Sequence, residues 1–151
     1  VADEIARARV PVILDAEDNQ AFTFESLNAN YRNAAILHEA GVLVAFKPGI
    51  ARIVFQIRTP RFLAGRTVPF GLPWEEALKA ITLNPARIFG FADRSGSIET
   101  GKDADLVLWS GDPLATTTVT RLVIIGGEIQ PAPAPNPLLR HRYPCDVRPV
   151  P

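Results

Sequence analysis

Residues 33–49, NAAILHEAGVLVAFKPG, contain the end of a helix, a strand and a turn within one short stretch. The apolar side chains of its first half recur with roughly helical spacing, and Gly41 is the residue type that most often ends a helix. The run 42–46 that follows is continuously apolar, which is typical of a strand buried on both faces. The stretch therefore predicts a helix over 24–40 and a buried strand over 42–46, which the turn beginning at Lys47 ends.

A second apolar run, residues 11–14, lies upstream and is followed by a polar loop over 15–20. Strand, helix and strand within about 35 residues are typical of a βαβ unit, whose two strands pair in parallel. We therefore expect the two runs to be neighbours in a parallel sheet. Residues 50–70 are ambiguous, because either half could begin as a helix or as a strand.

Two helices are predicted further along the chain. In GLPWEEALKAIT, Pro73 suits the first helical position, and Glu75 and Glu76 lie in the first turn, where the helix dipole favours acidic side chains. In NPARIFG, Asn84 can cap a second helix and Gly90 can end it.

Strands and tight turns are expected after the second helix. The run 105–109 is a strand candidate, and the pair Gly126-Gly127 within VTRLVIIGGEI suits a two-residue hairpin turn, because glycine readily takes the positive φ angles that such a turn needs. These features predict a small antiparallel meander.

Composition excludes several classes of partner. The chain has 151 residues, and its 16 Lys and Arg balance 16 Asp and Glu, so a broad attraction to nucleic acid or to an acidic membrane is not expected. No apolar run approaches the roughly 20 residues that a membrane-spanning helix needs. A single cysteine, Cys145, excludes an internal disulfide and leaves the compartment undetermined, with the cytoplasm favoured. The first residues have the pattern of the second half of an amphipathic helix, so we expect the chain to be a piece of a longer protein.

Residues 71–114, GLPWEEALKAITLNPARIFGFADRSGSIETGKDADLVLWSGDPL, resemble the C-terminal signature of the amidohydrolase superfamily, in particular the imidazolonepropionase-like metal-dependent hydrolases. The resemblance implies an α/β chain made of the last βα units of a TIM-type (β/α)8 barrel, followed by a small antiparallel β-sandwich meander. It implies a partial barrel over 1–90, a sandwich portion over 91–130 and a Pro-rich tail over 131–151.

The resemblance also implies a metal site that this chain does not complete. Members of the family bind one or two divalent ions, of the zinc type, through a His-x-His pair after the first strand, a lysine or other bridging group after the fourth, histidines after the fifth and sixth, and an aspartate after the eighth. The eighth strand corresponds to residues 42–46, and Lys47 stands where the aspartate is expected. The other ligands would lie upstream of Val1. We therefore expect no cofactor in this chain and a divalent metal only in a complete family enzyme.

Lys47 and His38 are the candidate catalytic residues, and each has an alternative interpretation. Lys47 could replace a metal electrostatically or hold an anionic group, or it could be a solvated lysine at a strand end. His38 could act in a site, or it could be a cation that favours a helix C-terminus. His141 lies in a basic segment of the tail, where an exposed position is expected, and the acidic GKDAD run is expected to form the turn that leads into a strand.

Two functional hypotheses follow. In the first, the chain is the C-terminal fragment of a hydrolase that acts on amide or cyclic amide C–N bonds of small molecules and is inactive without the upstream barrel. In the second, it is a non-catalytic α/β module for self-association or partner binding. Under both hypotheses, a quarter barrel leaves open strand edges and apolar faces, so we expect the upstream barrel or a homo-oligomer to cover them.

Overall fold

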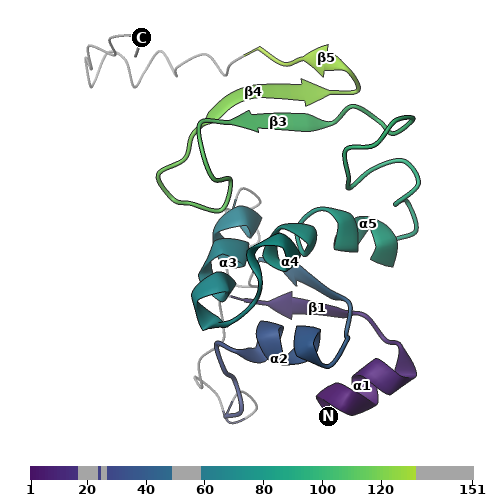
Figure 1. Ribbon diagram of the computed structural model, residues 1–151, viewed down its shortest axis with the longest axis vertical. Helices are drawn as coiled ribbons and strands as arrows, with labels where there is room; N and C mark the ends of the chain where they lie inside the picture. The colour runs from purple at the N-terminus through teal and green to yellow at the C-terminus, as the bar shows by residue number, and fades with distance from the viewer. Residues whose placement is uncertain (17–23, 25–26, 49–58, 132–151) are drawn as a thin grey trace.

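The computed structural model describes residues 1–16, 24, 27–48 and 59–131 of the chain (Figure 1). The helices and strands within these ranges are, in chain order, α1 (Ala2–Ala8), β1 (Val12–Asp15), α2 (Asn33–Glu39), β2 (Val44–Lys47), α3 (Pro60–Thr67), the 3-10 helix η3 (Val68–Phe70), α4 (Trp74–Lys79), α5 (Leu83–Ile88), β3 (Leu106–Trp109), β4 (Thr120–Ile125) and β5 (Glu128–Ile129). The chain thus has the α/β content that the sequence predicts.

The strands β1 and β2 form a parallel pair, in register from Val12 opposite Val44 to Asp15 opposite Lys47. Helix α2 lies in the connection between them, so the prediction of a parallel βαβ unit is confirmed. Both strands extend one residue further than predicted at their carboxyl ends. As a result, two charged residues, Asp15 and Lys47, belong to the strands themselves.

Helix α2 is much shorter than the helix predicted over 24–40. It begins at Asn33, because Asn30 directs the chain into a turn: its Oδ1 accepts a hydrogen bond from the backbone N–H of Arg32, and its carbonyl accepts one from the N–H of Asn33. Such local side-chain bonds compete with helix formation. The predicted end is correct, since Gly41 has a φ of 84° and follows the last turn directly.

Within the ambiguous segment 50–70, the structure describes residues 59–70. Residues 60–70 are helical and form α3 followed by η3. Pro60 takes the first position of α3, where its missing N–H costs no hydrogen bond. Residues 49–58 lie outside the described part of the chain.

The two later helices form where predicted, but their first residues differ. Pro73 precedes α4 instead of opening it, and Asn84 is not the cap of α5, because that helix begins one residue earlier, at Leu83. The Asn84 side chain is buried and donates from Nδ2 to the Val44 carbonyl oxygen at 2.8 Å. The side chain therefore joins α5 to β2 instead of capping its own helix.

The parallel pair lies between two groups of helices, with α1 and α2 on one side and α3, α4 and α5 on the other (Figure 1). The core between them is made mainly of small and branched apolar side chains: Ala34, Ala35, Val42, Val44, Phe46, Leu63, Ala64, Leu72, Ala77 and Ala80. The edge of β2 that faces away from β1 is partly occupied, because Phe46 N–H donates to the Ala80 carbonyl and Asn84 binds Val44. This edge of β2 is therefore less open than the sequence predicts.

The antiparallel sheet has the order β3-β4-β5, as the meander prediction requires. Gly126 and Gly127 form its hairpin turn, with φ angles of 58° and 84°. The β3–β4 loop, residues 110–119, reaches back to α3 and joins the sheet to the helices (Figure 1). Within the described ranges, no helix combines the length and apolarity needed to cross a bilayer.

Candidate functional site

The carboxyl ends of β1 and β2 bring Asp15 and Lys47 together. The two residues are register partners, and Lys47 Nζ lies 3.5 Å from Asp15 Oδ2. The aspartate side chain is mostly buried, at 17% exposed, and the lysine side chain is 39% exposed. In barrels of parallel strands, active sites lie at this end of the strands. This ion pair is therefore the first candidate for chemistry in the chain.

The sequence predicts Asp15 to be the first residue of the polar loop after the strand, and not a residue of the site. The signal was nevertheless present, because Asp15 and Lys47 each follow an apolar run directly and the carboxyl ends of parallel strands meet at one edge. Lys47 forms an ion pair with Asp15 of the neighbouring strand, and its side chain remains 39% exposed.

The donor atoms at this end do not fit a divalent metal ion. An ammonium group has no lone pair to donate, and within about 4 Å it would repel a cation strongly even in a partly wet site. Across the described ranges, no three His, Cys, Asp or Glu residues are grouped so that they could hold a metal ion. Asp15 supplies one carboxylate, and Lys47 already neutralises it.

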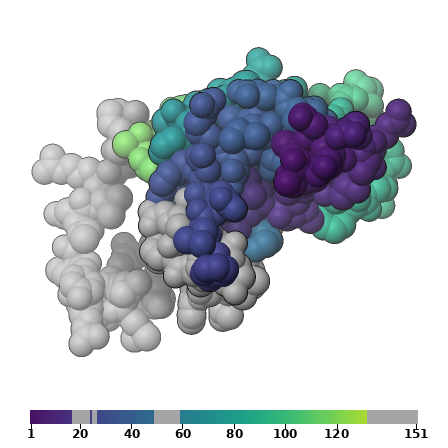
Figure 2. Space-filling model, turned by 90° about the horizontal axis from the view of Figure 1, so that it is seen from below, coloured from purple at the N-terminus to yellow at the C-terminus, as the bar shows by residue number. Residues whose placement is uncertain are grey.

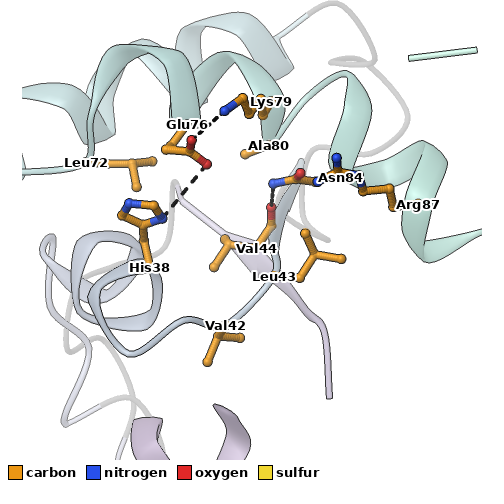
Figure 3. A pocket seen from close by; sticks show the side chains of 10 residues that line it. All are labelled: His38, Val42, Leu43, Val44, Leu72, Glu76, Lys79, Ala80, Asn84 and Arg87. Atoms are coloured by element: carbon orange, nitrogen blue, oxygen red, sulfur yellow. Dashed lines mark hydrogen bonds and ion pairs between the residues drawn. The ribbon is translucent and has the colours of Figure 1, made fainter. Parts of the chain in front are cut away.

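His38 lies at the opposite end of β2 and does not meet Lys47. It borders a pocket of about 190 Å³ that α2, β2, α4 and α5 enclose (Figure 3). The residues that line the pocket are His38, Val42, Leu43, Val44, Leu72, Glu76, Lys79, Ala80, Asn84 and Arg87. Because the amino ends of barrel strands usually contribute to stability, this position does not favour a role for His38 in barrel-type catalysis.

Glu76 connects the charged side chains of this pocket. Its Oε1 accepts a hydrogen bond from Lys79 Nζ at 2.7 Å, and its Oε2 lies 3.9 Å from His38 Nδ1 (Figure 3). The sequence placed His38 at a helix end, and the structure adds this contact to α4. The contact ties α2 to α4 across the pocket.

The acidic GKDAD run has the structural role that the sequence predicts. Asp103 forms an ion pair with Arg94, and Asp105 Oδ1 accepts a hydrogen bond from the Gly126 N–H at the hairpin turn. His141 and Cys145 lie outside the described residues.

The chain combines a parallel βαβ unit that carries charged residues at its carboxyl end with further helices and a small antiparallel sheet, and it is therefore an α/β protein. Residues 2–130 match the model of the amidohydrolase family, and the chain belongs to this family. The resemblance noted in the sequence is thereby confirmed.

Curated relatives and solved structures agree with the family. An imidazolonepropionase of Porphyromonas gingivalis is 40% identical over 87 residues, which cover 55% of this chain and 20% of the relative. An amidohydrolase of Hapsidospora irregularis is 39% identical over 67 residues, covering 44% of this chain and 7% of the relative. The crystal structure of an amidohydrolase from Thermotoga maritima superposes with a TM-score of 0.74 at 32% identity, covering 85% of this chain and 33% of that one. The chain thus spans a fifth or less of these curated relatives and about a third of the solved neighbour.

Proposed function

We propose that the chain is the C-terminal portion of a hydrolase that cleaves amide or cyclic amide C–N bonds of small molecules, and that it is inactive without the upstream barrel. In this proposal, residues 1–90 provide the last βα units of a (β/α)8 barrel, residues 91–130 provide part of a β-sandwich, and residues 131–151 form a Pro-rich tail. The similarity to imidazolonepropionases supports the class of bond.

The proposal rests mainly on how little of the Thermotoga maritima amidohydrolase this chain covers. This chain aligns over 85% of its own length but over only 33% of that structure. The described part of the chain contains one pair of parallel strands, whereas a closed barrel of this type has eight strands. Two strands cannot enclose an active site, so a complete site needs further strands from elsewhere.

Asp15 and Lys47 would form one part of the wall of such a site. The resemblance places a metal-binding aspartate at position 47, but the ion pair present there does not fit a divalent ion. We therefore assign the two residues no metal-dependent step. What they provide is a mutually neutralised pair of charges at the carboxyl end of the strands.

The proposed function is tested by completing the barrel. A chimera joins the upstream part of the Porphyromonas gingivalis imidazolonepropionase to this chain and is assayed, beside the isolated chain, against a panel of small cyclic amides. Each protein is prepared with Lys47 and with Lys47→Asp. We expect no hydrolysis by the isolated chain and hydrolysis by at least the Lys47→Asp chimera. If both chimeras fold and neither hydrolyses any amide, the hydrolase proposal fails; if the isolated chain is active, the proposed dependence on an upstream barrel fails.

Metal uptake by the same proteins gives a separate prediction. The Lys47→Asp chimera should bind about one more divalent ion per chain than the Lys47 chimera, because a repelling ammonium is replaced by a ligand beside Asp15. In the isolated chain the substitution should change nothing measurable, and both forms should hold less than one ion per chain. Elemental analysis after washing with a weak chelator measures the difference.

Arg121→Asp is the matched control, since it places an equal change of charge on β4, away from Lys47. Equal metal uptake by the Lys47 chimera and the Lys47→Asp chimera would contradict this account of the site.

Self-association is the second candidate function, and the exposed apolar side chains of the antiparallel sheet favour it. Large apolar residues are exposed on all three strands and at the end of the β3–β4 loop: Val107, Leu108, Val119, Ile125 and Ile129. Such surfaces on a free chain favour association. Since the outer edge of β2 is partly occupied, we place the association surface on this sheet.

Light scattering over a dilution series tests the association. The isolated chain should form dimers or larger assemblies, and Leu108→Lys should shift the mass toward the monomer, because it places a charge among exposed apolar side chains. A compact monomer at every concentration would show that the chain needs no partner for this sheet.

A further inference from the structure

We propose that the pocket at the amino end of β2 binds a small carboxylate that also carries an N–H group. The site lies outside the proposed hydrolytic centre, since β2 separates it from Lys47 by about 10 Å at roughly 3.3 Å per residue. The inference therefore does not depend on the proposed hydrolase function.

The size of the pocket limits the ligand. A volume of about 190 Å³ lies below the roughly 300–1,000 Å³ that is usual for pockets that hold drug-sized ligands, so the pocket suits a smaller molecule. Buried apolar side chains line part of it, from Val42, Val44, Leu72 and Ala80. A compact molecule with a short apolar body fits this space.

The charges around the pocket favour an anion. Lys79 and Arg87 are positive, and Glu76 is the one acidic residue among those that line it. Glu76 is already engaged by Lys79 at 2.7 Å and faces His38 at 3.9 Å, so its charge is largely compensated. One positive charge therefore remains, on the guanidinium of Arg87.

Arg87 is available for a ligand. It is exposed, and within the described part of the chain its guanidinium donates no hydrogen bond and forms no ion pair. Glu99 has a lowered pKa, mainly because Ser97 and Lys102 donate hydrogen bonds to it, and the attraction of Arg87 is the weakest of the causes. A planar guanidinium can bind a carboxylate through two parallel N–H donors.

Asn84 provides the complementary acceptor. The residue is 95% buried, and one N–H of its Nδ2 donates to the Val44 carbonyl (Figure 3). Its Oδ1 accepts no hydrogen bond from the described residues, and a buried acceptor without a donor is costly. An N–H group on the ligand would supply that donor, so the pocket favours a carboxylate that also carries an N–H.

The test titrates the whole ¹⁵N-labelled chain with each of three probes and follows the chain's backbone amide shifts by NMR. The probes are N-acetylglycine, its neutral amide N-acetylglycinamide, and acetate. N-acetylglycine should cause saturable shifts in residues 42–44 and 76–87 in the millimolar range. It should bind at least about fivefold more tightly than either other probe, because only it carries both the charge and the N–H.

Arg87→Gln should weaken the binding of N-acetylglycine at least about fivefold, because it removes the charge-assisted bonds but keeps a similar length. Lys79→Gln should also weaken it, since Glu76 then repels the carboxylate. Arg121→Gln, on β4 away from the pocket, should leave binding unchanged. The proposal is overturned if no saturable shifts occur at these residues, if the neutral amide or acetate binds as well as N-acetylglycine, or if Arg87→Gln binds like the unchanged chain.

Discussion

Replacing Gly65 with alanine is expected to destabilise the folded chain by about 1–3 kcal/mol, the usual cost of overpacking. The expectation is opposite to the general rule, since glycine to alanine inside a helix normally stabilises by up to about 1 kcal/mol. The reason is a contact of α3 with the β3–β4 loop: a Cβ on Gly65 would lie 2.5 Å from the Leu114 carbonyl oxygen. That oxygen belongs to the backbone of a buried residue and cannot move aside cheaply.

Urea denaturation followed by circular dichroism measures the effect as a lower midpoint. Arg66→Ala is the matched control, because it introduces alanine at the next position of the same helix, where the side chain is exposed. The control should change the free energy of unfolding by less than about 0.5 kcal/mol. A Gly65→Ala protein as stable as the control would mean that the loop does not pack against α3 as described.

Arg61→Ala is expected to destabilise the chain by about 2–4 kcal/mol. Hydrogen bonds from a charged group are worth about 1.5–3 kcal/mol each, but at this part-buried position water can replace part of what the three bonds contribute. The guanidinium donates to the carbonyl oxygens of Pro113, Ala115 and Thr118, at 3.0, 2.9 and 3.2 Å. It also lies over the rings of Phe62 and Trp109. One side chain thus holds three carbonyls of the β3–β4 loop against α3.

Arg61→Lys separates geometry from charge. A lysine keeps the positive charge but cannot reach three carbonyls with a planar fork, so it should recover less than half of the lost stability. The double variant Gly65→Ala with Arg61→Ala should lose less than the sum of the single losses, because each single change already loosens the same loop. Full recovery with lysine, or strict additivity, would contradict a single packed joint between the loop and α3.

The joint shares no residue with either charged site. Arg61 and Gly65 contact the β3–β4 loop, whereas the Asp15–Lys47 pair and the pocket at His38 depend on β1, β2, α2, α4 and α5. Loss of the joint should therefore lower the stability of the chain without changing the binding of N-acetylglycine, as long as the chain remains folded.

Local chemistry was sufficient to predict much of the fold. Glycine readily takes positive φ angles, which explains the end of α2 at Gly41, the end of α5 at Gly90 and the hairpin at Gly126-Gly127. All four glycines have positive φ in the structure. Continuous apolarity predicted the buried β2, and the short helical connection predicted its parallel pairing with β1. The signature in residues 71–114 was sufficient for the family.

Other features depend on contacts between residues far apart in the chain. Asn84 has the chemistry of a helix cap, but its side chain binds Val44, 40 positions away, because α5 packs across β2 and the buried carbonyl needs a donor. His38 meets Glu76 only because α2 and α4 border the same pocket.

By itself, the sequence determined the family, the order of the elements outside residues 50–70 and the glycines that end α2 and α5, because these depend on local backbone preference and on apolar periodicity. Tertiary structure alone decided that Asp15 neutralises Lys47, that Arg61 holds the β3–β4 loop, and that the pocket retains a net positive charge. The residues next to a charged side chain in the sequence do not identify its partner, because the partner is set by the register of two strands or the packing of two helices. The chemistry available at each end of β2 is therefore a property of the folded chain.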